Sequence, residues 1–359
     1  MATWKPSTVH LVGSVPLGSA EEVFTTALKD LPKRLRRIPD GETGERNGFV
    51  AWQMGVFPPK VSAIGAAPPT ISRTGEDTKS VGWDGWVIGA SEKNEEVKCT
   101  IEDIKPTGYD DNAIASYDTF VKLRESGVIP KGVRFQVSLP TPCNTIWACV
   151  DERFRAQVEP LYEKRLLDSL RRIQDTIPAR DVAIQLDLAM DVAFIEHERG
   201  YLKIPIFQSY FEPAMKCVIE RVVRISNAVD KNVELGYHLC YGDLGHKHFM
   251  EPQDLGLLVE IAGEIFKRVD HPVAWVHMPV PKDRTDKAYF EPLKNLKLPD
   301  GQLFLGLVHA NDEEGTKKRI ETAIDVYQKP FGIATECGMG RCAPEEFSSL
   351  MAITASVTL

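Results

Sequence analysis

The sequence lacks several features that define common classes of protein. No run of about twenty uncharged apolar residues occurs, so no segment is a candidate transmembrane helix. The first residues, Met-Ala-Thr-Trp-Lys-Pro, lack the long apolar stretch of a secretory signal. The seven cysteines are odd in number and irregularly spaced, unlike a disulfide framework. We therefore expect a cytoplasmic protein whose thiols are reduced and free to bind a metal.

Positive charge is also scarce. The chain has 43 Lys and Arg against 51 Asp and Glu, a formal net charge of -8. Nucleic-acid-binding proteins usually concentrate basic charge, and the short run Lys33–Arg37 is the local exception here. It falls between an expected helix and an expected strand, which favours a solvated or phosphate-positioning loop. We expect a small-molecule substrate, with neither nucleic acid nor a membrane as a partner.

A repeating order of strand and helix runs along the 359 residues. Short β-branched or apolar runs end in polar residues and alternate with segments in which apolar residues recur three or four positions apart. The expected strands are Val9–Val15, Leu35–Pro39, Val133–Leu139, Val182–Asp187, Val233–Cys240, Val273–Val280, Leu303–His309 and Phe331–Glu336. The expected helices include Ala20–Leu31, Arg153–Thr176, Tyr210–Ala228, Pro252–Arg268, Gly315–Gln328 and Pro344–Ala355.

Alternation of this kind indicates parallel strands, and closure into a barrel gives every strand two neighbours. We predict an α/β protein with a (β/α)8 TIM barrel, as one domain over residues 1–359, with an open doubly wound sheet as the alternative. Residues 57–112 interrupt the order because they are rich in Gly, Pro, Ser and Thr. We predict that they form an insertion after the second strand, either a lid or a small subdomain, with a disordered loop as the alternative.

Polar residues stand at nearly every expected strand end, and in this fold those ends converge on the face that carries the active site. They are Ser14, Asp40, Glu42, Ser138, Asp187, His238, Cys240, His277, His309, Glu336 and Cys337.

The strongest pattern among them is His238 and Cys240. Residues two apart in a strand point to the same side, so this pair can share a ligand. Zinc favours tetrahedral nitrogen and sulfur donors, which His277 and Cys337 could complete. Such a cysteine can also be a small buried hydrophobe, but its place at a strand end favours metal binding. We predict a zinc site of His238, Cys240 and Cys337, with His277 as the fourth ligand.

Other polar residues keep two interpretations each. Asp187 closes an apolar run, as a substrate anchor or as a helix N-cap. His309 is either a proton donor or a hydrogen-bonded barrel histidine. His246 and His248 follow the strand in a polar loop and are expected to face solvent, with closure of one of them over the metal as the alternative, whereas Cys342 is expected to be structural.

Several segments resemble motifs of the cobalamin-independent methionine synthase family. His-Leu-Cys-Tyr at His238–Tyr241 resembles that family's His-x-Cys-Tyr metal motif, and Glu336–Met339 resembles its Asp-Cys-Gly-Leu segment. Val12–Pro16 is similar to the opening Ile-Gly-Ser-Phe-Pro, Asp40–Asn47 to His-Gly-Glu-x-x-Arg-Asn, and Ile184–Asp187 to Ile-Gln-Ile-Asp. The resemblance spans most of the chain and implies the family's zinc-bearing catalytic barrel or a short single-barrel relative.

The resemblance also implies a chemistry. A substrate thiol would coordinate zinc, lose its proton and attack an alkyl carbon as a zinc-bound thiolate. Ser14, Glu42 and Asp187 would hold the amino-acid portion of that substrate, with Ser138 as a further candidate on the same face. His309 would serve as acid to the departing group.

The sequence departs from the family at one metal ligand. Where the family places Glu or Cys as its third ligand, this chain has His277. Two cysteinates and two neutral histidines give a neutral zinc site, in which the bound sulfur is somewhat less nucleophilic than with a Glu ligand.

We therefore predict a zinc-dependent methyl- or alkyl-transferase of the methionine synthase-like type that acts on a small thiol. The alternative is a zinc-dependent hydrolase or carbon–carbon lyase, in which the metal is a Lewis acid and Asp187 or His309 moves protons. A lesser alternative is a metal-free, decarboxylase-like barrel in which basic side chains, among them Arg37 and Arg284, bind anionic groups.

Overall fold

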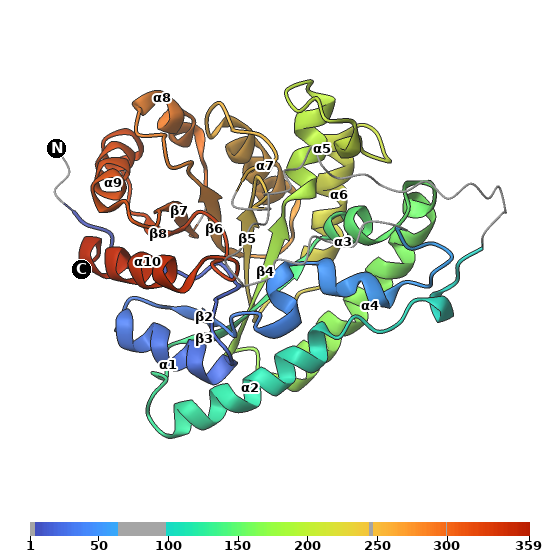
Figure 1. Cartoon of the computed structure of the whole chain (residues 1–359), viewed down its shortest axis with the longest axis horizontal. Helices are drawn as coiled ribbons and strands as arrows, with labels where there is room; N and C mark the ends of the chain where they lie inside the picture. Colours follow the sequence, from blue (N-terminus) through green and yellow to red (C-terminus); the bar gives the residue numbers. More distant parts are fainter. Residues whose placement is uncertain (1–3, 64–97, 244–246, 299) are drawn as a thin grey trace.

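The predicted barrel is confirmed. The computed structural model describes residues 4–63, 98–243, 247–298 and 300–359, and its strands form one parallel sheet in the order β1-β8-β7-β6-β5-β4-β3-β2 with helices around the outside (Figure 1). The eight strands are β1 (Val9–His10), β2 (Arg37–Pro39), β3 (Arg134–Pro140), β4 (Val182–Leu188), β5 (Glu234–Leu239), β6 (Val273–Pro279), β7 (Gln302–Val308) and β8 (Gly332–Thr335).

The barrel nearly closes between β1 and β2, where Val9 forms a single parallel bridge with Leu35. Beyond His10 the chain leaves the sheet, so the expected strand Val9–Val15 is much shorter in the structure. The reason is competition for its carbonyls. The side-chain amide of Gln136 donates to Leu11 O and Val12 O, and that of Gln185 donates to Val12 O.

Helices cover the strands, and each shows why its sequence is helical. In α6 the buried residues Val218, Ile219, Val222 and Ile225 recur at helical spacing, so one apolar face packs on the barrel. The α-helices are α1 (Ala20–Asp30), α2 (Tyr109–Glu125), α3 (Pro142–Cys149), α4 (Arg155–Thr176), α5 (Met190–Glu198), α6 (Ala214–Ser226), α7 (Gly256–Arg268), α8 (Lys287–Phe290), α9 (Glu313–Tyr327) and α10 (Pro344–Val357). Among the helices of the described ranges, none combines the length and apolar character needed to cross a membrane.

Short 3-10 helices occupy several connections. They are η1 (Gly44–Gly48), η2 (Ala51–Val56), η4 (Ile101–Asp103), η5 (Glu152–Phe154), η6 (Pro205–Phe207) and η7 (Glu291–Asn295).

The barrel interior is arranged in layers. At the amino-terminal end of the strands, the Arg37 guanidinium lies 4.0 Å over the Trp275 ring and its Nε donates to Glu234 Oε2 at 2.6 Å. Trp275 is fully buried, and Gly236 leaves room for it because a Cβ there would lie 2.0 Å from the indole. Above this layer lies a polar one, in which His10 Nε2 is 2.8 Å from Gln185 Oε1.

The expected insertion at residues 57–112 is described only at its two ends, since residues 64–97 lie outside the described residues. The first end is pinned to the segment after α3 by an antiparallel bridge between Ser62 and Val150. The second end approaches the first, because Lys60 Nζ donates to Lys98 O at 2.9 Å. The expected end at Asn112 differs from the structure, in which Tyr109 already begins α2.

Candidate metal centre and active site

Three metal-capable side chains meet at the carboxyl end of the barrel. His238 and Cys240 come from the end of β5 and Cys337 follows β8, and their ligand atoms all lie within 4.8 Å of one another. Cys240 Sγ is 3.7 Å from Cys337 Sγ, which is 3.8 Å from His238 Nε2. Tetrahedral zinc with ordinary bond lengths would place two sulfurs ~3.8 Å apart and a sulfur and a nitrogen ~3.6 Å apart. The donor set and its spacing therefore fit zinc.

His277 does not join this group. Its Nδ1 lies 2.7 Å from His238 Nδ1 and its Nε2 lies 3.1 Å from the carbonyl oxygen of Thr335, so both ring nitrogens already have partners. On neighbouring strands His277 stands directly beside His238 in register. The residue expected as the fourth ligand is therefore a hydrogen-bond partner of a candidate ligand, and among the described residues it is not one of the clustered donors.

Burial sets the charge of these groups. It lowers the pKa of His238 well below its usual range and that of His277 to about 3, so both rings are neutral near pH 7. The hydrogen bond with Cys337, followed by burial, raises the pKa of the Cys240 thiol.

Arg341, which the sequence did not single out, supplies positive charge beside the cysteines. Its Nη2 lies 3.9 Å from Cys337 Sγ and 2.7 Å from Asp243 Oδ2. The backbone N–H of Gly242 donates to Cys240 Sγ at 3.3 Å. The Gly242 contact favours the thiolate form of Cys240 and so opposes the hydrogen bond and burial that raise its pKa.

A cavity of about 360 Å³ opens in front of the cluster. Its polar wall includes the three donors together with Ser14, Glu42, Asn144, Asp187, Asp243 and Arg341. Its apolar wall includes Phe49, Val50, Met54, Trp147 and Met190. Ser138 lines a small adjoining pocket that shares Glu42 and Asp187 with this cavity. The structure thus brings the four residues expected to bind substrate to one region beside the metal-capable cluster.

Asp187 lines the cavity and does not cap α5. It belongs to β4, whereas α5 begins at Met190 with Ala189 at its N-cap, so Asp187 caps no helix. Gln185 Nε2 donates to Asp187 Oδ1 at 2.8 Å, and Asn144 Nδ2 donates to the Asp187 carbonyl at 2.9 Å. Burial, with a smaller contribution from the charge of Glu42, raises the pKa of the Asp187 carboxyl well above its usual range.

Glu42 is placed by the loop after β2. Its backbone N–H donates to Asp40 Oδ1 at 2.9 Å, and Asp40 in turn accepts from Ser116 Oγ at 2.8 Å and pairs with Arg46 at 2.9 Å. Burial and the charge of Asp40 raise the pKa of Glu42 to about 7. Asp40 thus supports the loop, while Glu42 faces the cavity.

Ser14 has a second role that its motif did not reveal. Its Oγ accepts from the Gly340 N–H at 3.2 Å and its carbonyl accepts from the Met339 N–H at 2.7 Å. Ser14 therefore fastens the loop that carries Cys337.

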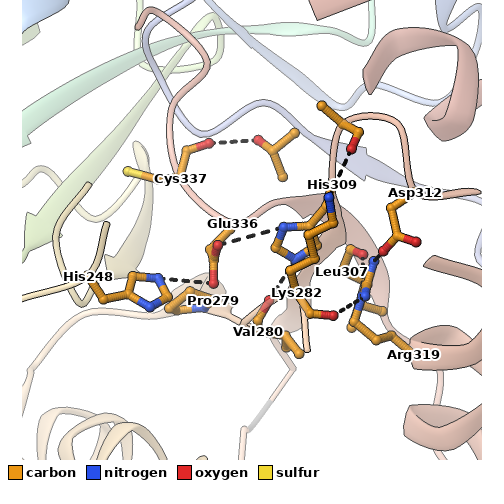
Figure 2. A network of polar contacts seen from close by, with 12 residues as sticks. His248, Pro279, Val280, Lys282, Leu307, His309, Asp312, Arg319, Glu336 and Cys337 are labelled. Carbon is orange, nitrogen blue, oxygen red and sulfur yellow. Dashed lines mark hydrogen bonds and ion pairs between the residues drawn. The ribbon is translucent and has the colours of Figure 1, made fainter. Parts of the chain in front are cut away.

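His309 belongs to a separate network, in which Glu336 lies between two imidazole rings (Figure 2). His309 Nε2 is 2.8 Å from Val280 O and its Nδ1 is 3.8 Å from Glu336 Oε2, while His248 Nε2 is 3.0 Å from Glu336 Oε1. In the described part of the chain, none of these three acid–base side chains lines the large cavity. The structure favours the interpretation of His309 as a hydrogen-bonded barrel histidine.

His248 does not face solvent as expected, because its side chain is only 9% exposed. Burial alone would lower its pKa, but hydrogen bonds with Glu251 and Glu336 raise the pKa of His248 to about 10. His246 lies outside the described residues. Cys342, expected to be structural, is partly buried and lines the large cavity.

The arginines of the decarboxylase-like alternative are engaged elsewhere. Arg37 is buried at the opposite end of the barrel, where it pairs with Glu234. Arg284 pairs with Asp286 at 2.9 Å, and its Nη1 donates to the carbonyl of Gln253. Neither lines the cavity beside the cluster.

Comparison with known proteins finds similarity only among solved structures, since no family model and no curated protein matches the sequence. A B12-independent methionine synthase from Shewanella sp. W3-18-1, in complex with selenomethionine, is 14% identical over 69% of this chain and 65% of that chain, with a TM-score of 0.44. A putative vitamin-B12 independent methionine synthase from Listeria monocytogenes is 14% identical over 69% and 68%, with a TM-score of 0.43. This chain thus spans slightly less than two thirds of the Shewanella protein. Similarity of this degree concerns the fold alone.

Proposed function

We propose that this protein is a zinc-dependent transferase that moves a methyl or alkyl group to the sulfur of a small thiol carrying an amino group. The observation that carries the proposal is the meeting of His238, Cys240 and Cys337 at the wall of a cavity that also contains Glu42 and Asp187. Two reduced cysteines in the ligand set also favour a reducing, cytoplasmic location.

Three donors are typical of a catalytic zinc site, because a tetrahedral ion then keeps one position for a substrate. A zinc ion held there would favour the deprotonated form of a thiol that joins it and so make its sulfur nucleophilic at neutral pH. Without His277 the protein supplies two cysteinates and one neutral histidine, which balance the charge of the ion. The added thiolate would then make the site anionic, in contrast to the closed four-ligand set expected from the sequence.

The two acids, Glu42 and Asp187, would bind the amino group of the substrate. Glu42, which is half-buried, and Asp187, which is buried, line the cavity with raised pKa values, and a bound ammonium group would favour their charged forms. Because the two acids and the two cysteines line the same cavity, a short amino thiol could reach both. The apolar residues Phe49, Met54 and Trp147 would contact the alkyl donor.

The test begins with metal analysis of protein purified without added metal. We expect about one zinc per chain, and its loss in Cys337→Ser. In the cobalt-substituted protein, homocysteine should produce a sulfur-to-metal charge-transfer band, whereas homoserine, which has a hydroxyl in place of the thiol, should not. The matched variant Asp187→Asn should keep the metal and bind homocysteine roughly tenfold more weakly, since it loses a charge-assisted hydrogen bond.

Two results would contradict the proposal. A cobalt spectrum that ignores thiols but responds to carbonyl compounds would favour the hydrolase or lyase alternative, in which the metal acts as a Lewis acid. Absence of bound metal, together with full activity after chelation, would favour a metal-free enzyme.

A further inference from the structure

We propose that His277 is a positioning residue that fixes the tautomer of His238, so that the Nε2 lone pair of His238 faces Cys240 and Cys337. The inference rests on the proposed metal site and adds to it a residue that touches neither metal nor substrate. Three consecutive contacts carry it: Thr335 O to His277, His277 to His238, and His238 to Cys337.

The direction of the first hydrogen bond is set by chemistry. A carbonyl oxygen only accepts, so the contact of 3.1 Å between Thr335 O and His277 Nε2 requires a proton on that nitrogen. A neutral imidazole carries one N–H, which leaves His277 Nδ1 as an acceptor.

The second hydrogen bond follows from the first. The two Nδ1 atoms are 2.7 Å apart, a distance that accommodates one proton between them and excludes two. Since His277 Nδ1 is the acceptor, His238 Nδ1 donates. A charged His277 would reverse this direction, but both side chains are buried and a buried cation without an anionic partner is strongly disfavoured. Neutral His238 therefore has its lone pair on Nε2.

The third contact gives the arrangement its function. His238 Nε2 is the atom that lies 3.8 Å from Cys337 Sγ, and a metal binds an imidazole nitrogen only through a free lone pair. In the other tautomer this nitrogen would bear a proton and could not bind metal. His277 thus removes the state of His238 that cannot serve as a ligand.

The surroundings hold His277 in place. Its side chain is fully buried, and its ring lies 4.8 Å from that of His238 and 5.9 Å from that of His10, measured between centroids. Thr335 ends β8 two residues before Cys337, so one strand end both anchors the histidine pair and delivers a cysteine ligand.

The experiment compares the full-length wild-type protein with His277→Phe and His277→Gln. Phenylalanine fills the space without a hydrogen bond, whereas glutamine offers both a donor for Thr335 O and an acceptor for His238. The zinc dissociation constant is measured by competition with a chromophoric chelator. We expect His277→Phe to weaken zinc binding by roughly 10- to 100-fold and His277→Gln to recover most of the loss. His271→Gln, at the amino-terminal end of β6, is the control and should bind zinc as the wild type does.

A second readout needs no variant of His277. In chelator-treated wild-type protein with ¹⁵N-labelled histidine, the resonances missing from His238→Gln identify His238, and their shifts report the tautomer. We expect the proton on Nδ1. A proton on Nε2, or zinc affinity unchanged in a folded His277→Phe, would overturn the inference. Failure of the wild type to bind zinc would instead sink the proposed function, and the tautomer of His238 would still be measurable.

Discussion

Glu42 has a disfavoured backbone conformation and a side chain with a raised pKa. Its φ is +47°, in the region that favours glycine, and Gly41 before it has φ of +80°. Such strain costs on the order of 1–3 kcal/mol and persists only where surrounding contacts enforce it. Here the contacts to Asp40 do so, and the carboxylate lies so close to Gly13 that a Cβ there would be 2.9 Å from Glu42 Oε1. The contacts of Glu42 thus hold its carboxyl group at the cavity although its backbone conformation is unfavourable.

The first prediction concerns Glu42→Gln. Because the folded pKa of about 7 lies above the ordinary 4.5, the folded chain binds more protons than the unfolded chain between these values. The free energy of unfolding of the wild type therefore falls as pH rises through this window. Glu42→Gln should remove that fall and be more stable at pH 8, by on the order of 1–3 kcal/mol. Urea unfolding at pH 5 and pH 8 measures it.

Glu125→Gln, at the exposed end of α2, is the control for that comparison. Equal losses of stability with pH in wild type and Glu42→Gln would show that another group is responsible. Glu42→Gln should also weaken the binding of an amino thiol, because the neutral amide cannot pair with the ammonium group of that ligand.

Some residues of the site follow from sequence and others do not. The alternation of a strand predicts that His238 and Cys240 share a face, and the structure brings them together with Cys337. The same rule gave His277 a place at a strand end but could not give the partners of its ring nitrogens, one of which is a backbone carbonyl 58 residues away. Arg341 lies in a loop, where no periodicity predicts the direction of a side chain.

At the scale of elements, the loop between β8 and α10 deserves comparison with an ordinary helix. Its glycines lie against Ser14, and a Cβ on Gly340 would be 2.6 Å from the Ser14 Cβ. By contrast, a Cβ on Gly263 in α7 would meet nothing within 4 Å. The loop therefore has no room for a side chain at Gly340, whereas α7 has room for one at Gly263.

This contrast gives the second prediction. Gly340→Ala should push the loop away from Ser14, displace Cys337 and weaken zinc binding by about tenfold, with a smaller effect on secondary structure measured by circular dichroism. Gly263→Ala should leave zinc binding unchanged and stabilise the fold by up to about 1 kcal/mol, because alanine favours a helix. Unchanged zinc affinity in Gly340→Ala would mean that the loop adapts without moving its cysteine.

Helices were predictable where one face is polar and the other is not. The strands other than β1 and the helices α1, α4, α6, α7, α9 and α10 fall close to their expected ranges. The helices α3 and α5 were not expected, because seven residues of each are buried and no polar face marks a period. The strand β1 was expected too long, since side-chain amides from the interior took the backbone acceptors that a sheet neighbour would use.

At the scale of the whole molecule, a metal at the cluster would join distant parts of the sheet. His238 lies in β5 and Cys240 directly follows that strand, whereas Cys337 comes two residues after β8. In the barrel, β6 and β7 lie between β5 and β8. A ligand that binds only the folded state adds to its stability in proportion to the logarithm of its free concentration over its dissociation constant.

The third prediction follows. Chelation should lower the melting temperature by a few degrees, and zinc at ~100 times its dissociation constant should restore about 2.7 kcal/mol of stability. Hydrogen exchange should show the gain at the strand ends of β5 and β8, with α2 and α4 little changed. The double variant Cys240→Ser/Cys337→Ser is the control and should not respond to zinc. A shift of equal size in that variant would place the metal elsewhere.

The architecture itself was readable from eight repeats of strand and helix, and the barrel has the expected parallel order. The near-gap between β1 and β2 could not be predicted from the sequence, because it depends on which side chains reach the Leu11 and Val12 carbonyls in three dimensions.

The layer of Arg37, Glu234 and Trp275 fills the barrel interior at the amino-terminal ends of the strands. In the part of the chain that the structure describes, the cavity beside the His238–Cys240–Cys337 cluster lies at the carboxyl ends of the strands, opposite this layer. Under the proposed function, the amino thiol and the alkyl donor would share this entrance, and we expect the two to bind in a fixed order.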